Sequence, residues 1–169
     1  MAVVSGDIKY YLSGGATGAG NSNPAVSLGG VITTTLVGTN IFDNVTSGEA
    51  TAGDVEYRCI FVKNTNATSD TLYSAKVWVV TNTPSGDTEV KIALAGEGVS
   101  ATTEIVAGEG SAPSGESFAV CANEGAGLSL GNLVAGAYYG IWIQRTVTLG
   151  ASAYSNDGFT LRVKGDTSA

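Results

Sequence analysis

The strongest constraint on the fold is a pair of apolar segments joined by a short polar stretch. Residues 56–64 (EYRCIFVKN) and 71–80 (TLYSAKVWVV) are rich in β-branched and aromatic residues, and residues 65–70 between them have turn composition. Both segments carry apolar side chains on both faces near their centres, which is typical of strands covered on two sides. We therefore expect central strands of a sandwich, or strands at a subunit interface.

The rest of the chain also favours strands. Strand character, from alternation or from runs of β-branched residues, recurs at residues 8–12, 31–37, 89–94, 137–147 and 159–163. Asn156-Asp157-Gly158 predicts a hairpin turn before the last of these segments. No segment has a helical period. We predict an all-β fold, an antiparallel β-sandwich of jelly-roll or immunoglobulin-like topology, because alternation alone does not encode strand order.

A glycine-rich segment follows the first predicted strand. Residues 13–24 (SGGATGAGNSNP) have almost no side chain to bury, which indicates a loop or a flexible arm. We expect residues 1–27 to form an N-terminal strand with an extended arm, and residues 28–169 to form a single sandwich domain. With Ile8, Tyr10 and Leu12 as its apolar residues, such an arm can contact a neighbouring molecule. An ordinary long loop between edge strands is the alternative.

The charge of the chain limits its partners. It has 8 Lys and Arg against 15 Asp and Glu, a net charge of −7, which disfavours direct contact with nucleic acid phosphates. The acidic residues concentrate between Asp87 and Glu124, where Lys91 is the one cation. This stretch fits a solvated, loop-rich face. It also fits a surface that meets a basic partner, with Glu97, Glu104, Glu109 and Glu116 as candidate contacts.

The residues that usually carry catalysis are missing or scattered. The chain has no histidine, which excludes Ser-His-Asp and Cys-His nucleophilic systems. No carboxylate pair is singled out by spacing for glycoside hydrolysis. Residues 155–158 (SNDG) match only a fragment of a calcium loop and fit a structural turn better. We therefore expect no catalytic residue, no cofactor and no metal.

The two cysteines lie far apart in the sequence. Cys59 sits within an apolar strand, and Cys121 follows a short apolar stretch. A bridge between them and two buried free thiols are both compatible with the sequence, and the apolar neighbours favour the free thiols. The first residues lack the basic and apolar regions of a secretory signal, and no apolar run approaches the about 20 residues of a membrane span. We expect no membrane contact.

Three segments resemble virion structural proteins of tailed bacteriophages. They are residues 5–15 (SGDIKYYLSGG), 23–30 (NPAVSLGG) and 56–65 (EYRCIFVKNT), and the resemblance extends from Ser5 to Lys164. In addition, residues 61–65 followed by 72–80 are similar to bacterial and phage immunoglobulin-like sandwiches.

The resemblance implies a non-enzymatic part of a virion, and a capsid decoration (cement) protein in particular. Its partners would be the major capsid protein and other copies of itself, as a homotrimer, on the outer surface of the capsid. The protein would be made in the host cytoplasm. A tail- or fibre-associated structural or receptor-binding protein is the alternative.

Overall fold

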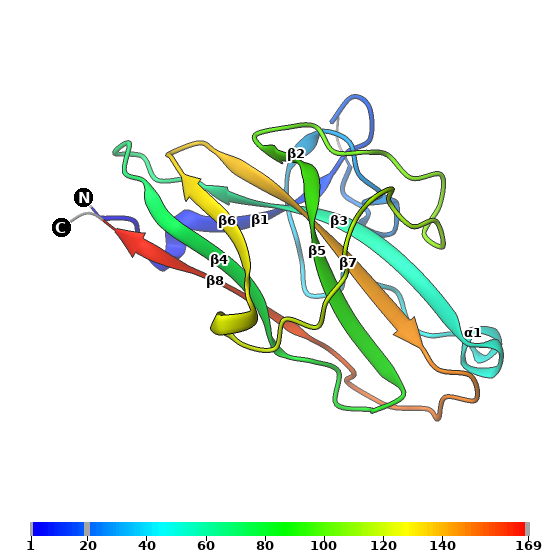
Figure 1. The fold of residues 1–169 in the computed structure, drawn as a ribbon. Coiled ribbons are helices and arrows are strands. Elements are labelled where there is room, and N and C mark those ends of the chain that lie inside the picture. The colour runs from blue at the N-terminus through cyan, green and yellow to red at the C-terminus, as the bar shows by residue number, and fades with distance from the viewer. Residues whose placement is uncertain (1, 19–20, 168–169) are drawn as a thin grey trace.

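The computed structural model describes residues 2–18 and 21–167, which form an antiparallel β-sandwich (Figure 1). The described strands are β1 (Ile8–Ser13), β2 (Ile32–Leu36), β3 (Asp54–Asn64), β4 (Leu72–Thr81), β5 (Thr88–Val99), β6 (Leu128–Leu133), β7 (Tyr138–Val147) and β8 (Thr160–Thr167). Short helical elements connect them: α1 (Ser47–Ala52) and the 3₁₀ turns η1 (Ser5–Asp7), η2 (Pro24–Val26) and η3 (Glu124–Ala126). The predicted all-β sandwich is confirmed.

The described strands form one sheet in the order β2-β1-β3-β7-β5 and a second in the order β6-β4-β8. The two apolar segments of residues 56–64 and 71–80 become β3 and β4, and each lies at the centre of its sheet, as predicted. They do not pair with each other, because the polar stretch between them carries the chain from one sheet to the other. The sheets therefore face each other with β3 and β4 near the middle.

The main core lies between the two sheets. Ile60 and Val62 of β3 and Ile141 of β7 pack in the same buried cluster as Val77 of β4 and Leu130 of β6. The exposed fraction of each of these side chains is 2% or less. Since full burial of a large aliphatic side chain contributes about 1.5–3 kcal/mol, this layer provides most of the attraction between the sheets.

A second, smaller core covers the opposite face of the five-stranded sheet. Its centre is Trp142 of β7 with Tyr57 and Cys59 of β3, and residues of the irregular segment 100–127 pack over it. The ring of Phe118 meets that of Tyr57 edge-on, with 5.4 Å between their centroids. Strand β3 is thus covered on both faces, which explains its apolar residues at odd and even positions.

The two cysteines belong to different cores. Cys59 lies in the outer cluster and Cys121 lies between the sheets, and both are free and buried. Burial raises the pKa of the Cys59 thiol to about 12, so it stays protonated and acts as a small apolar side chain. The expectation of two free thiols is confirmed.

Strand β1 is built into the five-stranded sheet. It pairs with β2 on one side and with β3 on the other, and Leu12 is almost fully buried. The glycine-rich stretch after it is tied back, because the Gly14 N–H donates to Val31 O and the Gly15 N–H donates to Gly29 O. The sequence-based boundary at residue 27 therefore does not mark a separable arm, and β1 has no free edge for a neighbouring molecule.

Other local predictions differ from the structure. The turn at residues 156–158 leads into β8, but β7 and β8 lie in different sheets, so the predicted hairpin is wrong. Residues 47–52 form α1, although no segment of the sequence has a helical period. Thr46 and Glu49 form a capping box at its start, in which each side chain accepts a hydrogen bond from the other residue's backbone N–H.

Gly29 shows how closely the loop layer approaches the sheet. It has a φ of +97°, and a Cβ at this position would overlap the carbonyl oxygen of Glu104. The chain bridges here to Ile105, which fixes the start of the irregular segment over the outer core. Only glycine combines this backbone conformation with such a close approach.

We expect Gly29→Ala to lower the free energy of unfolding by at least about 2 kcal/mol, through left-handed strain and displacement of the residue 104 backbone. Gly38→Ala is the matched control, because a Cβ there meets nothing within 4 Å and the φ is not positive. Chemical denaturation of the two variants measures the difference. Equal stability would contradict the described packing of this loop.

Asp7 fastens the N-terminal segment to the turn between β3 and β4. Its Oδ2 accepts hydrogen bonds from the Val4 N–H at 2.9 Å and from Asn66 Nδ2 at 3.0 Å. The Asp7 carbonyl accepts from the N–H and the hydroxyl of Thr65. These bonds favour the ionised carboxylate, so the backbone bond from Val4 and then the Asn66 bond hold the pKa of Asp7 below 3.8.

A lowered carboxyl pKa stabilises the fold above the unfolded-state pKa, and that contribution disappears as pH falls through the folded-state value. We therefore expect Asp7→Asn to lower the melting temperature at pH 7. The gap from the parent protein should close as pH falls below 3.8. Thermal melts followed by circular dichroism between pH 7 and pH 2 test this. A gap that is constant over that range would show that the ionised carboxylate is not what matters.

Candidate functional site

The most unusual site in the described structure is a group of charged side chains on the inner face of β3 and β7. Glu56 of β3 lies directly opposite Arg145 of β7 in the sheet register. Arg145 Nε donates to Glu56 Oε2 at 2.6 Å, and the same carboxylate also contacts Arg145 Nη2. The exposed fraction of Glu56 is 1% and that of Arg58, two residues later on the same face, is 0%. Charged groups that are buried this deeply need opposite charges or hydrogen-bond partners close by.

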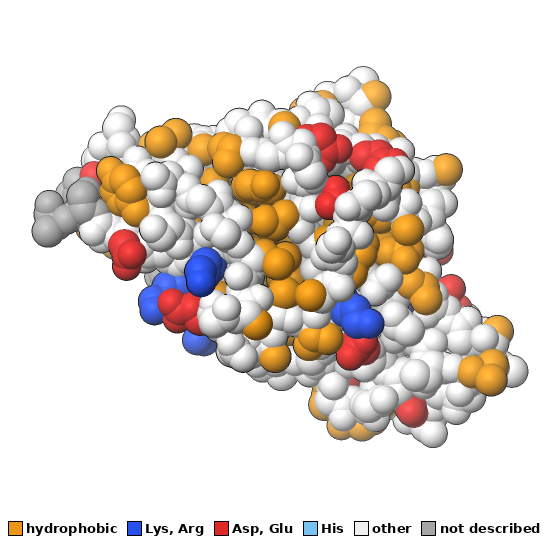
Figure 2. All heavy atoms as spheres, viewed as in Figure 1, with side chains coloured by type: hydrophobic (Ala, Val, Ile, Leu, Met, Phe, Trp, Pro, Cys, Tyr) orange, Lys and Arg blue, Asp and Glu red, His pale blue; other side chains and the backbone are white. Residues whose placement is uncertain are grey.

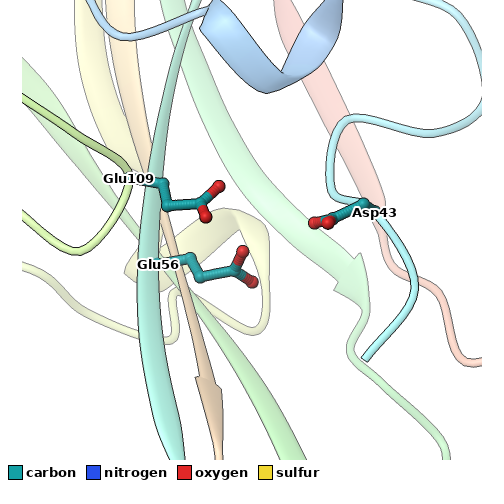
Figure 3. Close-up of side chains that lie close together, drawn as sticks. All are labelled: Asp43, Glu56 and Glu109. Carbon is teal, nitrogen blue, oxygen red and sulfur yellow. The ribbon is translucent and has the colours of Figure 1, made fainter. Parts of the chain in front are cut away.

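Arg58 has its partners on three sides. Its Nη2 lies 2.6 Å from Glu109 Oε2, 3.7 Å from Glu56 Oε1 and 3.8 Å from Asp43 Oδ1. Figure 3 shows the carboxyl groups of Glu56 and Glu109 extending toward that of Asp43. Asp43 comes from the loop between β2 and α1, and its backbone carbonyl accepts from Arg145 Nη1 at 2.7 Å. Three separate segments therefore meet at one guanidinium group.

An aromatic ring completes the group. The centroid of the Phe42 ring lies 4.8 Å from Arg145 Cζ and 5.3 Å from Arg58 Cζ. The centroid of the Phe159 ring in turn lies 6.3 Å from that of the Phe42 ring. Guanidinium groups over an aromatic face gain electrostatic attraction, and more so when water is excluded. The ring thus holds the loop of residues 37–46 against the charged strands.

The carboxylates alone have the spacing of a cation site. One oxygen from each of Asp43, Glu56 and Glu109 lies within 4.8 Å of the others. However, Nη2 of Arg58 is within 4 Å of all three, and it supplies the positive charge that a metal ion would bring. With Arg145 included, two cations balance two of the three carboxylates. We therefore assign this group as a structural ion-pair network, the charged cluster.

Burial governs the ionisation of Glu56. Desolvation raises the pKa of this carboxyl, and the attraction of Arg145 opposes the rise. Its Oε1 accepts no hydrogen bond from the described residues, which adds to the cost of the charged form. A carboxylate with a raised pKa in a cleft can be a general acid, but here a guanidinium group already occupies its other oxygen.

An open cleft of about 1100 Å³ lies beside the charged cluster. Its floor is the inner face of the five-stranded sheet, where the buried residues Ile60, Val90 and Ile143 and the partly buried Tyr10 line it. Its walls are the loop at residues 37–47 and the segment of residues 151–161, which runs into β8. Burial raises the pKa of the Tyr10 phenol to about 12, so this group stays neutral and cannot act as a base near pH 7.

Asp157 organises the opposite wall of the cleft. Its carboxylate accepts from the Ser85 N–H at 3.2 Å, from the Ser85 hydroxyl at 2.9 Å and from the Thr88 hydroxyl. These bonds tie the loop before β8 to the start of β5. On this wall the side chains of Asp157, Ser85 and Thr88 are therefore already engaged with one another.

The apolar residues predicted as partner contacts lie on β1. Leu12 is buried in the inter-sheet core, and Ile8 and Tyr10 are partly buried and pack against it. Tyr10 also lines the cleft. Contact of these three residues with a partner stays a prediction, although most of their apolar surface already contacts the chain itself.

The acidic residues predicted as partner contacts hold the irregular segment in place. Glu116 Oε1 accepts from the Gly96 N–H at 2.8 Å, and Glu97 Oε1 accepts from the Glu104 N–H at 2.6 Å. Glu104 accepts from both the N–H and the hydroxyl of Ser114. The fourth residue, Glu109, belongs to the charged cluster. Figure 2 shows acidic side chains gathered over the loops at the upper right of the view.

Sequence analysis missed the charged cluster as a site. Glu56 and Arg58 lie two residues apart in a strand that is apolar on both faces, and that spacing indicates a buried ion pair. Arg145 carries the same signal within the apolar strand of residues 137–147. Nothing in the sequence pointed to Asp43 and Phe42 as their partners, because loop conformation brings these two residues to the strands.

Comparison with protein-family models, with curated proteins and with solved structures found no match. Within the described residues, no helix is long and apolar enough to cross a membrane.

We expect Arg145→Ala to lower the free energy of unfolding by about 3–5 kcal/mol, because the buried Glu56 carboxylate loses the cation that pairs with it. The exposed pair Lys91–Glu89, 3.0 Å apart, provides the control. Lys91→Ala should change stability by no more than about 1 kcal/mol. Urea denaturation measures both variants. Similar small losses in both would show that the cluster is open to water.

Proposed function

We propose that the chain is a non-enzymatic structural protein of a bacteriophage virion, a decoration protein on the outer surface of the capsid. The observation that carries the proposal is the placement of charge. The buried arginines pair with carboxylates in a network that fastens loops to strands, and the other acidic side chains lie at the surface. This arrangement supports a role in binding through surfaces.

The architecture suits a rigid protein that is present in many identical copies. The five-stranded sheet is covered on both faces, by the second sheet and by the irregular segment, so its outline is held by two cores. A net charge of −7 reduces attraction to nucleic acid and nonspecific association of copies at high local concentration. The resemblance of residues 5–15, 23–30 and 56–65 to phage virion proteins supports the same role.

The mechanism follows from mass action. A protein that binds the assembled shell, and not its separate subunits, stabilises the shell by its binding free energy. The partner is the major capsid protein, with further contacts between copies of this chain as a homotrimer. The chain contacts neither nucleic acid nor membrane in this role.

We expect virions that lack the protein to release their DNA at a lower temperature than complete virions, because the shell loses the binding free energy of every copy. Adding back the purified protein should restore the higher temperature. Dye-accessible DNA is measured during a thermal ramp. In a second experiment, gold-labelled antibody on intact virions shows where the protein is located.

Label spread evenly over the head supports decoration. Label at a single pole would instead assign the protein to the tail or a fibre, as would release temperatures that do not depend on the protein.

A further inference from the structure

The edge strands of the two sheets differ in how they are protected. An unpaired edge exposes a row of N–H and C=O groups that can pair with another chain, and proteins usually blunt or cover it. The N–H and C=O of Val90 on β5 bond to the side-chain amide of Asn82, and those of Ile92 bond to Ala119. Strand β5 therefore presents a covered edge.

Two other edge strands are irregular. In β2 the register shifts opposite Leu12, and the Thr33 hydroxyl takes the Leu12 carbonyl and the Thr35 N–H as hydrogen-bond partners. In β6 the register shifts on both sides of its pairing with Ala75, and Gly131 has a φ of +70°. Bulges of this kind twist an edge and interrupt pairing.

Strand β8 is the regular edge. Its two register shifts lie on β4, which places an extra residue opposite β8 each time, so β8 itself runs evenly. No described strand pairs with its outer side. The Val79 N–H bonds to Cys121 on the far side of β4, so the N–H of its partner Leu161 points away from the sheet. By alternation, the N–H groups of Val163 and Gly165 do the same.

The cleft adjoins this edge. Leu161 of β8 and the preceding Phe159 line it together with Tyr10 of β1 and Val37 after β2. Leu161 and Val163 face the inter-sheet core but are only partly buried. A strand added beside β8 would therefore place every second side chain over apolar surface that the sandwich leaves partly exposed.

The opposite face of β8 carries two basic side chains at its centre and the acidic Asp166 toward its end. Arg162 and Lys164 project from it, and Lys76 of β4 lies directly across from Lys164. Like charges opposite each other in a sheet are unfavourable, and Glu124 offsets only part of this through its pair with Lys164 at 2.9 Å. Figure 2 shows Lys and Arg side chains gathered at the lower left, over the β4–β8 side of the molecule in Figure 1.

We propose that β8 is an acceptor edge for an extended segment of another protein chain, which adds antiparallel to it. The segment alternates apolar residues, which enter the cleft side, with acidic residues, which face Arg162 and Lys164. Main-chain bonds supply the attachment, and the alternation supplies specificity. This inference concerns binding in solution and does not depend on the proposed capsid role.

The two central charges of β8, Arg162 and Lys164, favour an acidic strand over a second copy as the occupant. In an antiparallel pair of two β8 strands centred on Val163, Arg162 of one copy would oppose Lys164 of the other. Centred on Lys164, the two lysines would oppose each other, while Arg162 of each copy would oppose Asp166 of the other. An acidic strand relieves the repulsion at both residues, whereas self-pairing places a like charge opposite Lys164 in either register.

The test uses the full chain and a capped octapeptide of alternating valine and glutamate, followed by amide NMR. We expect saturable shifts at Leu161, Val163 and Gly165, with slower hydrogen exchange at these amides. The same peptide N-methylated at each valine, which cannot bond to β8, should not bind. A peptide with lysine in place of glutamate should bind more weakly than the acidic one.

Arg162→Glu should weaken binding of the acidic peptide about two- to fivefold, the range of one cross-strand charge pair. Lys9→Glu, an equal charge change at an exposed site on β1, is the matched control and should leave binding unchanged. The proposal is overturned if the N-methylated peptide binds equally, if millimolar acidic peptide leaves the β8 amides unchanged, or if the shifts lie elsewhere. It is also overturned if the β8 amides shift with protein concentration alone, which would assign the edge to a second copy.

Discussion

The structure depends on the enclosure of β3. This strand is paired on both edges, with β1 and β7, and covered on both faces, by the inter-sheet core and the outer core. Every other layer is placed relative to it: the second sheet lies over its even-numbered residues, and the irregular segment lies over its odd-numbered residues. A strand enclosed in this way cannot offer an edge or a face to a partner, so the surfaces available for binding belong to the later strands and the loops.

The sequence predicted which segments form strands far better than which strands pair with each other. Runs such as residues 56–64 show strand type and two-sided burial, because side-chain alternation is a local property. Pairing is not local: the Asp157–Gly158 turn suggested a hairpin, yet β8 pairs with β4, 79 to 95 residues earlier in the chain. The helix that starts at the capping box of Thr46 and Glu49 was missed, because its six residues are too few to show a period.

The same limit applies to the sites. Glutamates 97, 104 and 116 looked like a free acidic surface, because the sequence does not show that backbone N–H groups of a long loop would need acceptors. Likewise, Ile8 and Leu12 looked available because a glycine-rich stretch follows them, but hydrogen bonds to residues 29–31 return that stretch to the sheet. The open edge of β8 emerged only from comparing how the edge strands are covered.

The charged cluster also answers a question that hydrophobic alternation leaves open. A one-residue slip between β3 and β7 would turn apolar side chains to the wrong face, so burial excludes it. A two-residue slip keeps every side chain on its face and is not excluded in this way. It would, however, move Glu56 away from Arg145, its direct partner in the register, and leave two buried charges unmatched. Because breaking such a pair costs several kcal/mol, the ion pair selects one register among those that the apolar pattern permits.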